Sequence, residues 1–296
     1  MKKKRRNAGD MGLDLVNAFL LLIYAFICIY PFYYILIYSF SDPIESQKGV
    51  YLLPVGVTLQ NYIKIFQLKG LAVSALVSIA RTLAGTALTA VSCTFFAYLV
   101  TKKQMYFRKA IYRFVVISMY FNAGLIPWYL TMKMLHLNNN FLVYILPYTI
   151  SAYYVILLKT FIEQLPPALE ESATLDGAGL ITIFVKLVFP LSMPIIATIT
   201  VFAAVAQWNT WFDNYFLVQN PNLKTLQLLL YEYLSEADRV AKASTEDLTR
   251  GLATKKMTPE TVRMTITMVV TFPILFVYPF MQKYFVKGIM LGAVKG

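Results

Sequence analysis

Six long apolar segments are the feature of this sequence that most constrains its fold. Each holds about 20 or more mainly apolar residues, the helix length needed to cross a hydrocarbon core of about 30 Å. The chain is 58% hydrophobic and 14% charged, whereas soluble domains are about 45 to 50% apolar and about 25% charged. We therefore predict an all-α integral membrane protein and exclude a soluble enzyme. The segments run over residues 13–40, 72–100, 114–134, 141–159, 187–217 and 264–285.

Basic residues are distributed unevenly between the two sides of the predicted membrane domain. With six spans both termini face one side, whose segments carry fifteen Lys and Arg against four in the short loops of the other side. The long segment 213–263 on that other side carries seven more bases together with seven acids. Cytoplasmic loops carry the excess of basic residues. We therefore predict cytoplasmic termini, with a basic N-terminus at 1–12, a six-helix domain at 13–285 and a tail at 286–296. The net charge of +12 is thereby assigned to loops beside membrane lipid, and not to nucleic acid.

Arg81 is a basic residue inside an apolar segment. Lys102 and Lys103 mark the cytoplasmic end of that segment, and about 20 residues outward from them places Arg81 near the opposite interface. Terminal arginines commonly extend their charged group to the interface while the stem stays in apolar surroundings. We expect Arg81 to do this rather than to line a solute path.

Residue types that support catalysis or metal binding are sparse. Cys28 and Cys93 both lie in apolar runs, and the single histidine, His136, lies between two leucines, whereas a metal site needs several converging ligands. The pattern of a phosphate-binding loop, G-x-x-x-x-G-K-[ST], does not occur. We predict no catalytic residue, no metal and no cofactor bound by this chain.

The segment 163–186 has the local chemistry of a short cytoplasmic helix. Pro166 and Pro167 favour a helix start, and Glu170 and Glu171 are expected in the first turn, where the positive end of the helix dipole favours acids. Gly177 permits a left-handed stop. The loop from Lys159 to Lys186 has four acids and two bases, so we interpret it as a surface that receives a protein rather than anionic lipid.

The same residues resemble a motif of bacterial ABC importer permeases, which is E-A-A, three residues, G, nine residues and then I-x-L-P in the loop before the penultimate span. The spacing in this chain is the same, and the substitutions of the alanine, isoleucine and leucine are mild. The matching residues are Glu171, Ala173, Asp176, Gly177 and Pro190, and Ser172 occupies the position of the first alanine.

The resemblance covers essentially the whole chain. The stretches 121–127, 208–212, 226–227 and 278–296 are similar to MalG-type carbohydrate permeases, in particular the branch for oligo- and polysaccharides that includes alginate permeases. The resemblance implies the MetI-like fold of type I importers in a bacterial plasma membrane. It also implies a second, homologous permease, two ATP-binding subunits that hold ATP and Mg, and an extracytoplasmic sugar-binding protein.

Two groups of contact residues follow from this resemblance. The motif, together with Glu170, would form a coupling helix seated in a cleft of the ATPase. The tail after residue 285, with its apolar residues, would reach between the two ATPases. The tail residues concerned are Ile289, Met290, Leu291, Val294 and Lys295.

The solute path is harder to place from the sequence. Sugars present apolar C–H faces and many hydroxyls, which aromatic and amide side chains bind well. We select Trp208, Asn209 and Trp211 near the outer end of the fifth segment, and Asn122 and Gly124 in the third. The segment 213–263 is the largest predicted external feature and the expected docking surface for an external partner.

Three alternatives remain open at this point. A permease for a non-sugar solute would carry the same coupling motif. A secondary transporter would hold its own coupling ions near the membrane midplane, but the apolar segments have no acid at a helix centre. A structural scaffold requires the coupling motif to be accidental.

Overall fold

The computed structural model describes residues 8–242 and 258–293, and every regular element in these ranges is helical. The chain divides into two compact units. The first comprises residues 1–68 and 232–271, and the second comprises 69–231 and 272–296. The helices α12 (Leu226–Lys242) and α14 (Pro259–Ala293) each contribute to both units.

The first unit contains the long apolar helix α1 (Ala8–Ser39) and the short helices η1 (Glu45–Lys48) and α2 (Gln60–Phe66). The side-chain amide of Asn61 in α2 donates hydrogen bonds to the backbone oxygens of Ser39 (3.0 Å) and Ser41 (2.8 Å). These bonds tie α2 to the end of α1.

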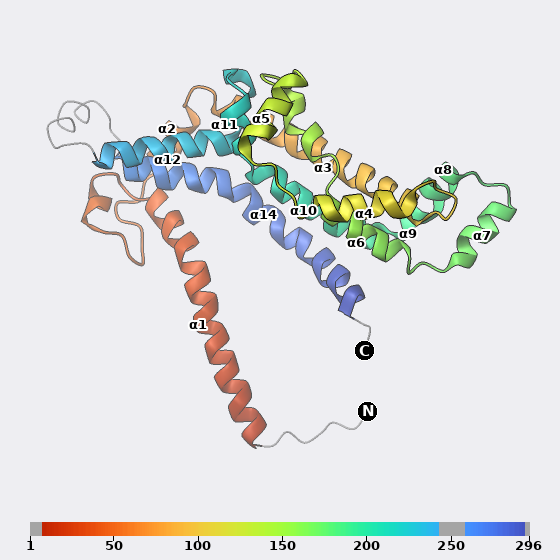
Figure 1. Ribbon diagram of the computed structural model, residues 1–296. Coiled ribbons are helices and arrows are strands. Elements are labelled where there is room, and N and C mark those ends of the chain that lie inside the picture. Colours follow the sequence, from red (N-terminus) through yellow and green to blue (C-terminus); the bar gives the residue numbers. More distant parts are fainter. Residues whose placement is uncertain (1–7, 243–257, 294–296) are drawn as a thin grey trace. The chain divides into compact units, whose positions relative to one another are not determined.

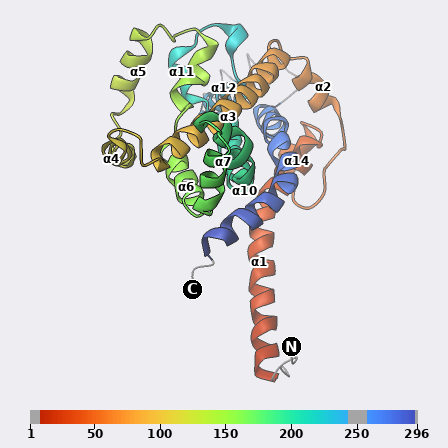
Figure 2. The ribbon, with the colours of Figure 1, turned by 90° about the vertical axis from the view of Figure 1, so that its right-hand side faces the viewer.

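The second unit is built around α3 (Leu71–Thr101), α6 (Ala152–Ile162) and α10 (Met193–Asn209). Its main core includes Cys93, Ala97, Val155 and Ile199, and the small residues on α3 allow close helix packing. In Figure 1, α7 (Pro167–Leu175) lies at one end of this unit, and α5 (Leu125–Met134) and α11 (Phe212–Leu217) lie at the other. Figure 2, seen from the α7 end, shows α4 (Arg108–Ser118) and α5 to one side of α3.

The third apolar segment is not one continuous helix, contrary to the prediction for 114–134. Helix α4 ends at Ser118 and α5 begins at Leu125. In the link, the Asn122 carboxamide oxygen accepts a hydrogen bond from the Gly124 backbone N–H at 2.9 Å, and Gly124 has a φ of +83°. This local turn competes with the helical hydrogen-bond pattern, so the helix is interrupted.

The fourth and fifth segments are also broken. The fourth comprises η2 (Phe141–Tyr144), η3 (Leu146–Tyr148) and then α6, with a bend of 46°. The fifth starts earlier than predicted, with α8 (Leu180–Ile183), the π-helical turn η4 (Phe184–Val188) and α9 (Phe189–Leu191), and bends by 80° before α10. Proline lacks the amide donor that a continuous helix needs, which explains breaks near prolines. The short helix η5 (Pro221–Leu223) follows α11.

The count of six spans is therefore not reproduced by the helices themselves. Three of the described helical segments are long and apolar enough to cross a membrane, namely Gly12–Ser39, Leu71–Thr101 and Pro259–Val277. The two bent pairs raise this number to five if each is one span. The predicted all-helical membrane architecture is confirmed.

Candidate functional site

Helix α7 has the start and stop that the sequence predicts. Pro167 is its first residue, Glu170 lies in its first turn, and Gly177 after its end has a φ of +81°. The backbone N–H of Ala178 donates to the oxygen of Ala173 and that of Gly177 to the oxygen of Thr174, both at 3.0 Å. This pair of bonds is the Schellman motif, which favours glycine at the left-handed position. One detail of the prediction is wrong, because Glu171 follows the first turn rather than lying in it.

The inner face of α7 is fixed to the end of α3. The Lys102 ammonium forms an ion pair with the Glu170 carboxylate and lies 4.0 Å from the centroid of the Tyr98 ring. The Tyr98 hydroxyl in turn donates to the backbone oxygen of Leu180 at 3.3 Å, at the start of α8. Ala173 packs against the main core of the second unit. These contacts join α7 to α3 and to the fifth apolar segment.

The outer face of α7 carries the remaining motif residues. Glu171, Ser172, Asp176 and Gly177 are all exposed, and Leu175 next to them is 89% exposed. These residues thus separate into an outer group that is free to contact another protein and an inner group, the motif residue Ala173 with the preceding Glu170, that contacts its own chain. Pro190 lies apart from both groups, exposed in α9.

We predict that the ion pair between Lys102 and Glu170 contributes to coupling more than to stability. Part-exposed pairs contribute only about 0.2–1 kcal/mol to stability, so Glu170→Lys should barely change thermal unfolding but should lower solute transport per ATP several-fold. The charge swap with Lys102→Glu should restore much of the loss. Transport and ATPase rates of the reconstituted complex measure this ratio.

The matched control is Glu163→Lys, which breaks the pair between Lys159 and Glu163 within one exposed helical turn. This variant should leave the ratio unchanged. A charge swap no better than Glu170→Lys alone would contradict the role of the pair.

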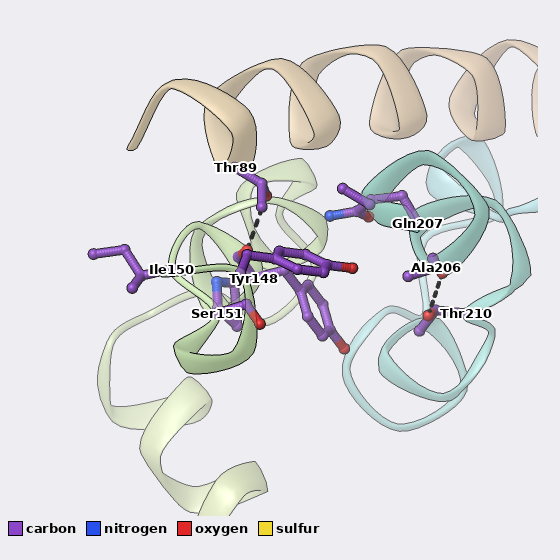
Figure 3. Close-up of a pocket in the computed structure, with 10 residues that line it drawn as sticks. Thr89, Tyr148, Ile150, Ser151, Ala206, Gln207 and Thr210 are labelled. Carbon is purple, nitrogen blue, oxygen red and sulfur yellow. Dashed lines mark hydrogen bonds between the residues drawn. The ribbon is translucent and has the colours of Figure 1, made fainter. Parts of the chain in front are cut away.

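A polar cavity of about 310 Å³ lies between α3, the segment before α6 and the end of α10. In Figure 3, Thr89 extends from α3, Tyr148 and Ser151 lie on one side, and Gln207 and Thr210 lie on the other. Thr89 donates to the backbone oxygen of Tyr148 at 2.9 Å. The residues that line this polar cavity are Thr89, Pro147, Tyr148, Ile150, Ser151, Tyr154, Ala203, Ala206, Gln207 and Thr210.

A buried ion pair contacts two residues of the cavity wall, Gln207 and Thr210. The Arg81 guanidinium donates to both carboxylate oxygens of Asp213, at 3.1 and 2.7 Å, and the two side chains are 1% and 0% exposed. The guanidinium also donates to the side-chain oxygen of Gln207, at 3.3 and 3.2 Å, and to the backbone oxygen of Thr210 at 3.0 Å. Its central carbon lies 4.6 Å from the centroid of the Tyr144 ring. The pair therefore connects α3, α10 and α11.

This arrangement corrects the expectation for Arg81. The guanidinium does not extend away from the protein but is buried within the chain beside a carboxylate. Asp213, predicted as the first residue of an external segment, is likewise buried. The sequence did contain a signal for this ion pair, namely an arginine in one apolar segment and an aspartate near the end of another. Buried charges require a partner, so the two residues could have been paired.

The five residues predicted for the solute path do not form one group, and none of them lines the polar cavity. Trp208 borders a separate apolar hollow of about 320 Å³, with Leu83, Val205 and Pro273 among its neighbours. The Asn209 side chain accepts from the Gln227 amide at 3.3 Å.

Trp211 stacks on Tyr231 with ring centroids 4.2 Å apart. Asn122 and Gly124 form the exposed turn between α4 and α5. The sequence reasoning missed the residues of the polar cavity, above all Gln207, which is a polar residue inside an apolar segment.

The predicted tail is partly helical. Helix α14 continues to Ala293, past the predicted end of the last segment at 285, and it includes Ile289, Met290 and Leu291. Val294 and Lys295 lie outside the described residues, as do residues 1–7 of the predicted basic N-terminus.

The fold and the coupling segment are those of a transport permease. Residues 90–291 match the family described as binding-protein-dependent transport system inner membrane component, and the chain belongs to this family. It is a multi-pass membrane permease subunit of an ABC importer. The subunit is non-catalytic, because ATP hydrolysis belongs to partner ATPases in this family.

Several relatives match over nearly the whole chain. The chain is 35% identical over 278 residues to the polygalacturonan/rhamnogalacturonan transport system permease protein YtcP of Bacillus subtilis (strain 168), covering 93% of this chain and 96% of the relative. It is 35% identical to the protein LplC of the same organism, with 91% and 90% covered.

A solved structure, a bacterial ABC transporter involved in the import of the acidic polysaccharide alginate, matches with a TM-score of 0.86 and 30% identity over 96% of this chain and 100% of the matched chain. These findings confirm the predicted resemblance to carbohydrate permeases and the MetI-like fold.

Proposed function

We propose that this chain is a permease subunit of a bacterial ATP-driven importer for oligo- or polysaccharides. The observation that carries the proposal is the match over nearly the full chain to a structure from an alginate importer. The similarity to a polygalacturonan/rhamnogalacturonan permease supports the same solute class. Both of these polysaccharides contain acidic sugars, so we propose uronate-containing oligosaccharides as the first solutes to test.

The proposed assembly contains one copy of this chain, a second homologous permease, two ATP-binding subunits and an extracytoplasmic sugar-binding protein. The proposed topology has six spans and both termini in the cytoplasm. The distribution of basic residues supports it, and the broken third segment, α4 with α5, would supply the sixth span together with the five candidates. Segment 213–263 is the proposed docking surface for the binding protein.

The proposed mechanism couples ATP-driven closure of the ATPases to rocking of the two permeases. In it, Glu171, Ser172, Asp176 and Gly177 contact the ATPase cleft, and Glu170 and Ala173 transmit the movement to α3. The tail residues 289–296 form a second contact with the ATPases. Exposure of the outer face of α7 beside Leu175 supports the first contact.

Reconstitution of the complete complex in proteoliposomes tests the function. We expect the binding protein loaded with trigalacturonate to stimulate ATP hydrolysis and to drive accumulation of the sugar, and we expect no stable transport-competent complex without the second permease. A panel of alginate trimer, maltotriose, a dipeptide and an amino acid gives the solute class. Stimulation and uptake by the peptide or amino acid alone would contradict a saccharide importer and would favour the non-sugar alternative.

A further inference from the structure

Gln207 is held in a fixed orientation at the wall of the polar cavity. Its side-chain oxygen accepts two hydrogen bonds from the Arg81 guanidinium, at 3.3 Å from Nε and 3.2 Å from a terminal nitrogen. Arg81 is a donor only, so it can bind the oxygen of the carboxamide but not the nitrogen. The amide nitrogen of Gln207 must therefore point away from Arg81.

This amide nitrogen is a buried donor without an acceptor in the described chain. Gln207 is 4% exposed, and its Nε2 atom has no hydrogen-bond partner among the described residues. A buried donor left unpaired costs about 1–3 kcal/mol. Figure 3 shows the amide group of Gln207 directed towards the side of the cavity formed by Thr89 and Tyr148. A ligand oxygen that reached this nitrogen from the cavity would satisfy it.

The backbone opposite Gln207 is shaped to admit the amide. A Cβ atom at Gly85 would lie 2.5 Å from Nε2 of Gln207 and 2.7 Å from its carboxamide carbon. Gly85 therefore provides the space in which the Gln207 amide sits. Replacement of this glycine would displace the amide without changing any residue that lines the cavity.

The chemistry of the cavity wall defines the class of group it accepts. None of its ten described lining residues is charged, and they combine the rings of Tyr148 and Tyr154 with the hydroxyls of Thr89, Ser151 and Thr210. Aromatic faces with a few placed polar groups suit the C–H faces and hydroxyls of a sugar ring. The volume of about 310 Å³ is at the lower end of ligand sites, which are about 300–1,000 Å³.

We propose that the polar cavity is a sugar-binding subsite of the solute path, in which the Gln207 amide donates a hydrogen bond to a ring or hydroxyl oxygen of the solute. This inference rests on the proposed saccharide function and specifies where one sugar unit is bound. The pair of Arg81 and Asp213 acts as a positioning group, because it orients Gln207 without lining the cavity. With no cation in its wall, the subsite binds the hydroxylated part of an acidic sugar and leaves its carboxylate to another site.

The test is the variant Gln207→Glu in the complete transporter, with trigalacturonate and maltotriose as probes. Glutamate keeps the oxygen that accepts from Arg81 but replaces the donor with an acceptor. We expect the solute concentration for half-maximal uptake to rise about ten- to hundredfold, since each tenfold change corresponds to about 1.4 kcal/mol. Stimulation of ATP hydrolysis by the loaded binding protein should remain, because α7 and its contacts are unchanged.

Two further variants make the outcome decisive. Gly85→Ala should weaken uptake in the same way, and it decides the question if Gln207→Glu does not assemble. Thr200→Val is the control on the same helix, because in the described part of the chain the Thr200 hydroxyl donates to the backbone oxygen of Ile196, and Thr200 does not line the cavity.

If wild-type uptake is saccharide-specific and an assembled Gln207→Glu or Gly85→Ala complex matches it, the subsite is refuted while the proposed function stands. Failure of the wild type to take up any saccharide would refute the proposed function instead.

Discussion

Replacement of Gly177 by valine should separate ATP hydrolysis from transport. Gly177 has a φ of +81°, and a side chain held in that conformation costs of the order of 1–3 kcal/mol, most for a β-branched residue. The Schellman motif that ends α7 would be lost, and the outer face would no longer fit the ATPase. We expect transport to fall at least tenfold while membrane insertion and basal ATP hydrolysis are retained, as measured with the reconstituted complex.

The matched control for this prediction is Gly177→Asn. Asparagine tolerates the left-handed conformation, and a Cβ at this position meets no atom within 4 Å in the described chain. The asparagine variant should therefore keep most of the transport. If asparagine is as damaging as valine, the requirement is close approach of the ATPase rather than the backbone conformation. A valine variant with normal transport would contradict the coupling role altogether.

Loss of either partner of the buried pair between Arg81 and Asp213 should destabilise the protein severely. Removing one member of a buried ion pair leaves an uncompensated charge and costs about 3–5 kcal/mol. Arg81→Met and Asp213→Leu should each lower the midpoint of thermal unfolding and the yield of assembled complex. Fluorescence-detected size-exclusion chromatography after heating measures both quantities.

The double variant Arg81→Met with Asp213→Leu separates the pair from its neighbours. Replacing both charges with apolar residues is often close to neutral, so the double variant should be more stable than either single one. It should not regain full stability, because the Gln207 oxygen would lose both of its donors from Arg81. Additive losses in the double variant would show that the two charges do not depend on each other.

Local structure was predictable wherever it depended on residues near each other in the chain. The start of α7 at Pro167 and its stop at Gly177 follow from the backbone preferences of proline and glycine. The family was equally accessible, because the motif from Glu171 to Pro190 is a local pattern. The lengths of the apolar segments likewise defined an all-helical membrane protein.

The breaks within the apolar segments were harder to predict from the sequence. The hydrophobicity of the sequence predicts the length of an apolar segment. It does not predict the turn at Asn122 and Gly124 or the 80° bend within the fifth segment. The relevant hydrogen bonds and proline positions redirect the backbone while the composition stays apolar.

What the sequence by itself determined is the membrane class, the helix α7 and the family, since each rests on composition or on residues within about 20 positions. Only the tertiary structure determined that Arg81 is buried in an ion pair, because its partners Asp213 and Gln207 lie 132 and 126 positions away in the sequence. The position of the polar cavity also depends on the tertiary structure, because Thr89, Tyr148 and Gln207 come from three separate segments. An ion pair or a cavity depends on which helix faces pack together, and that choice is made by the summed burial of many side chains rather than by any local pattern.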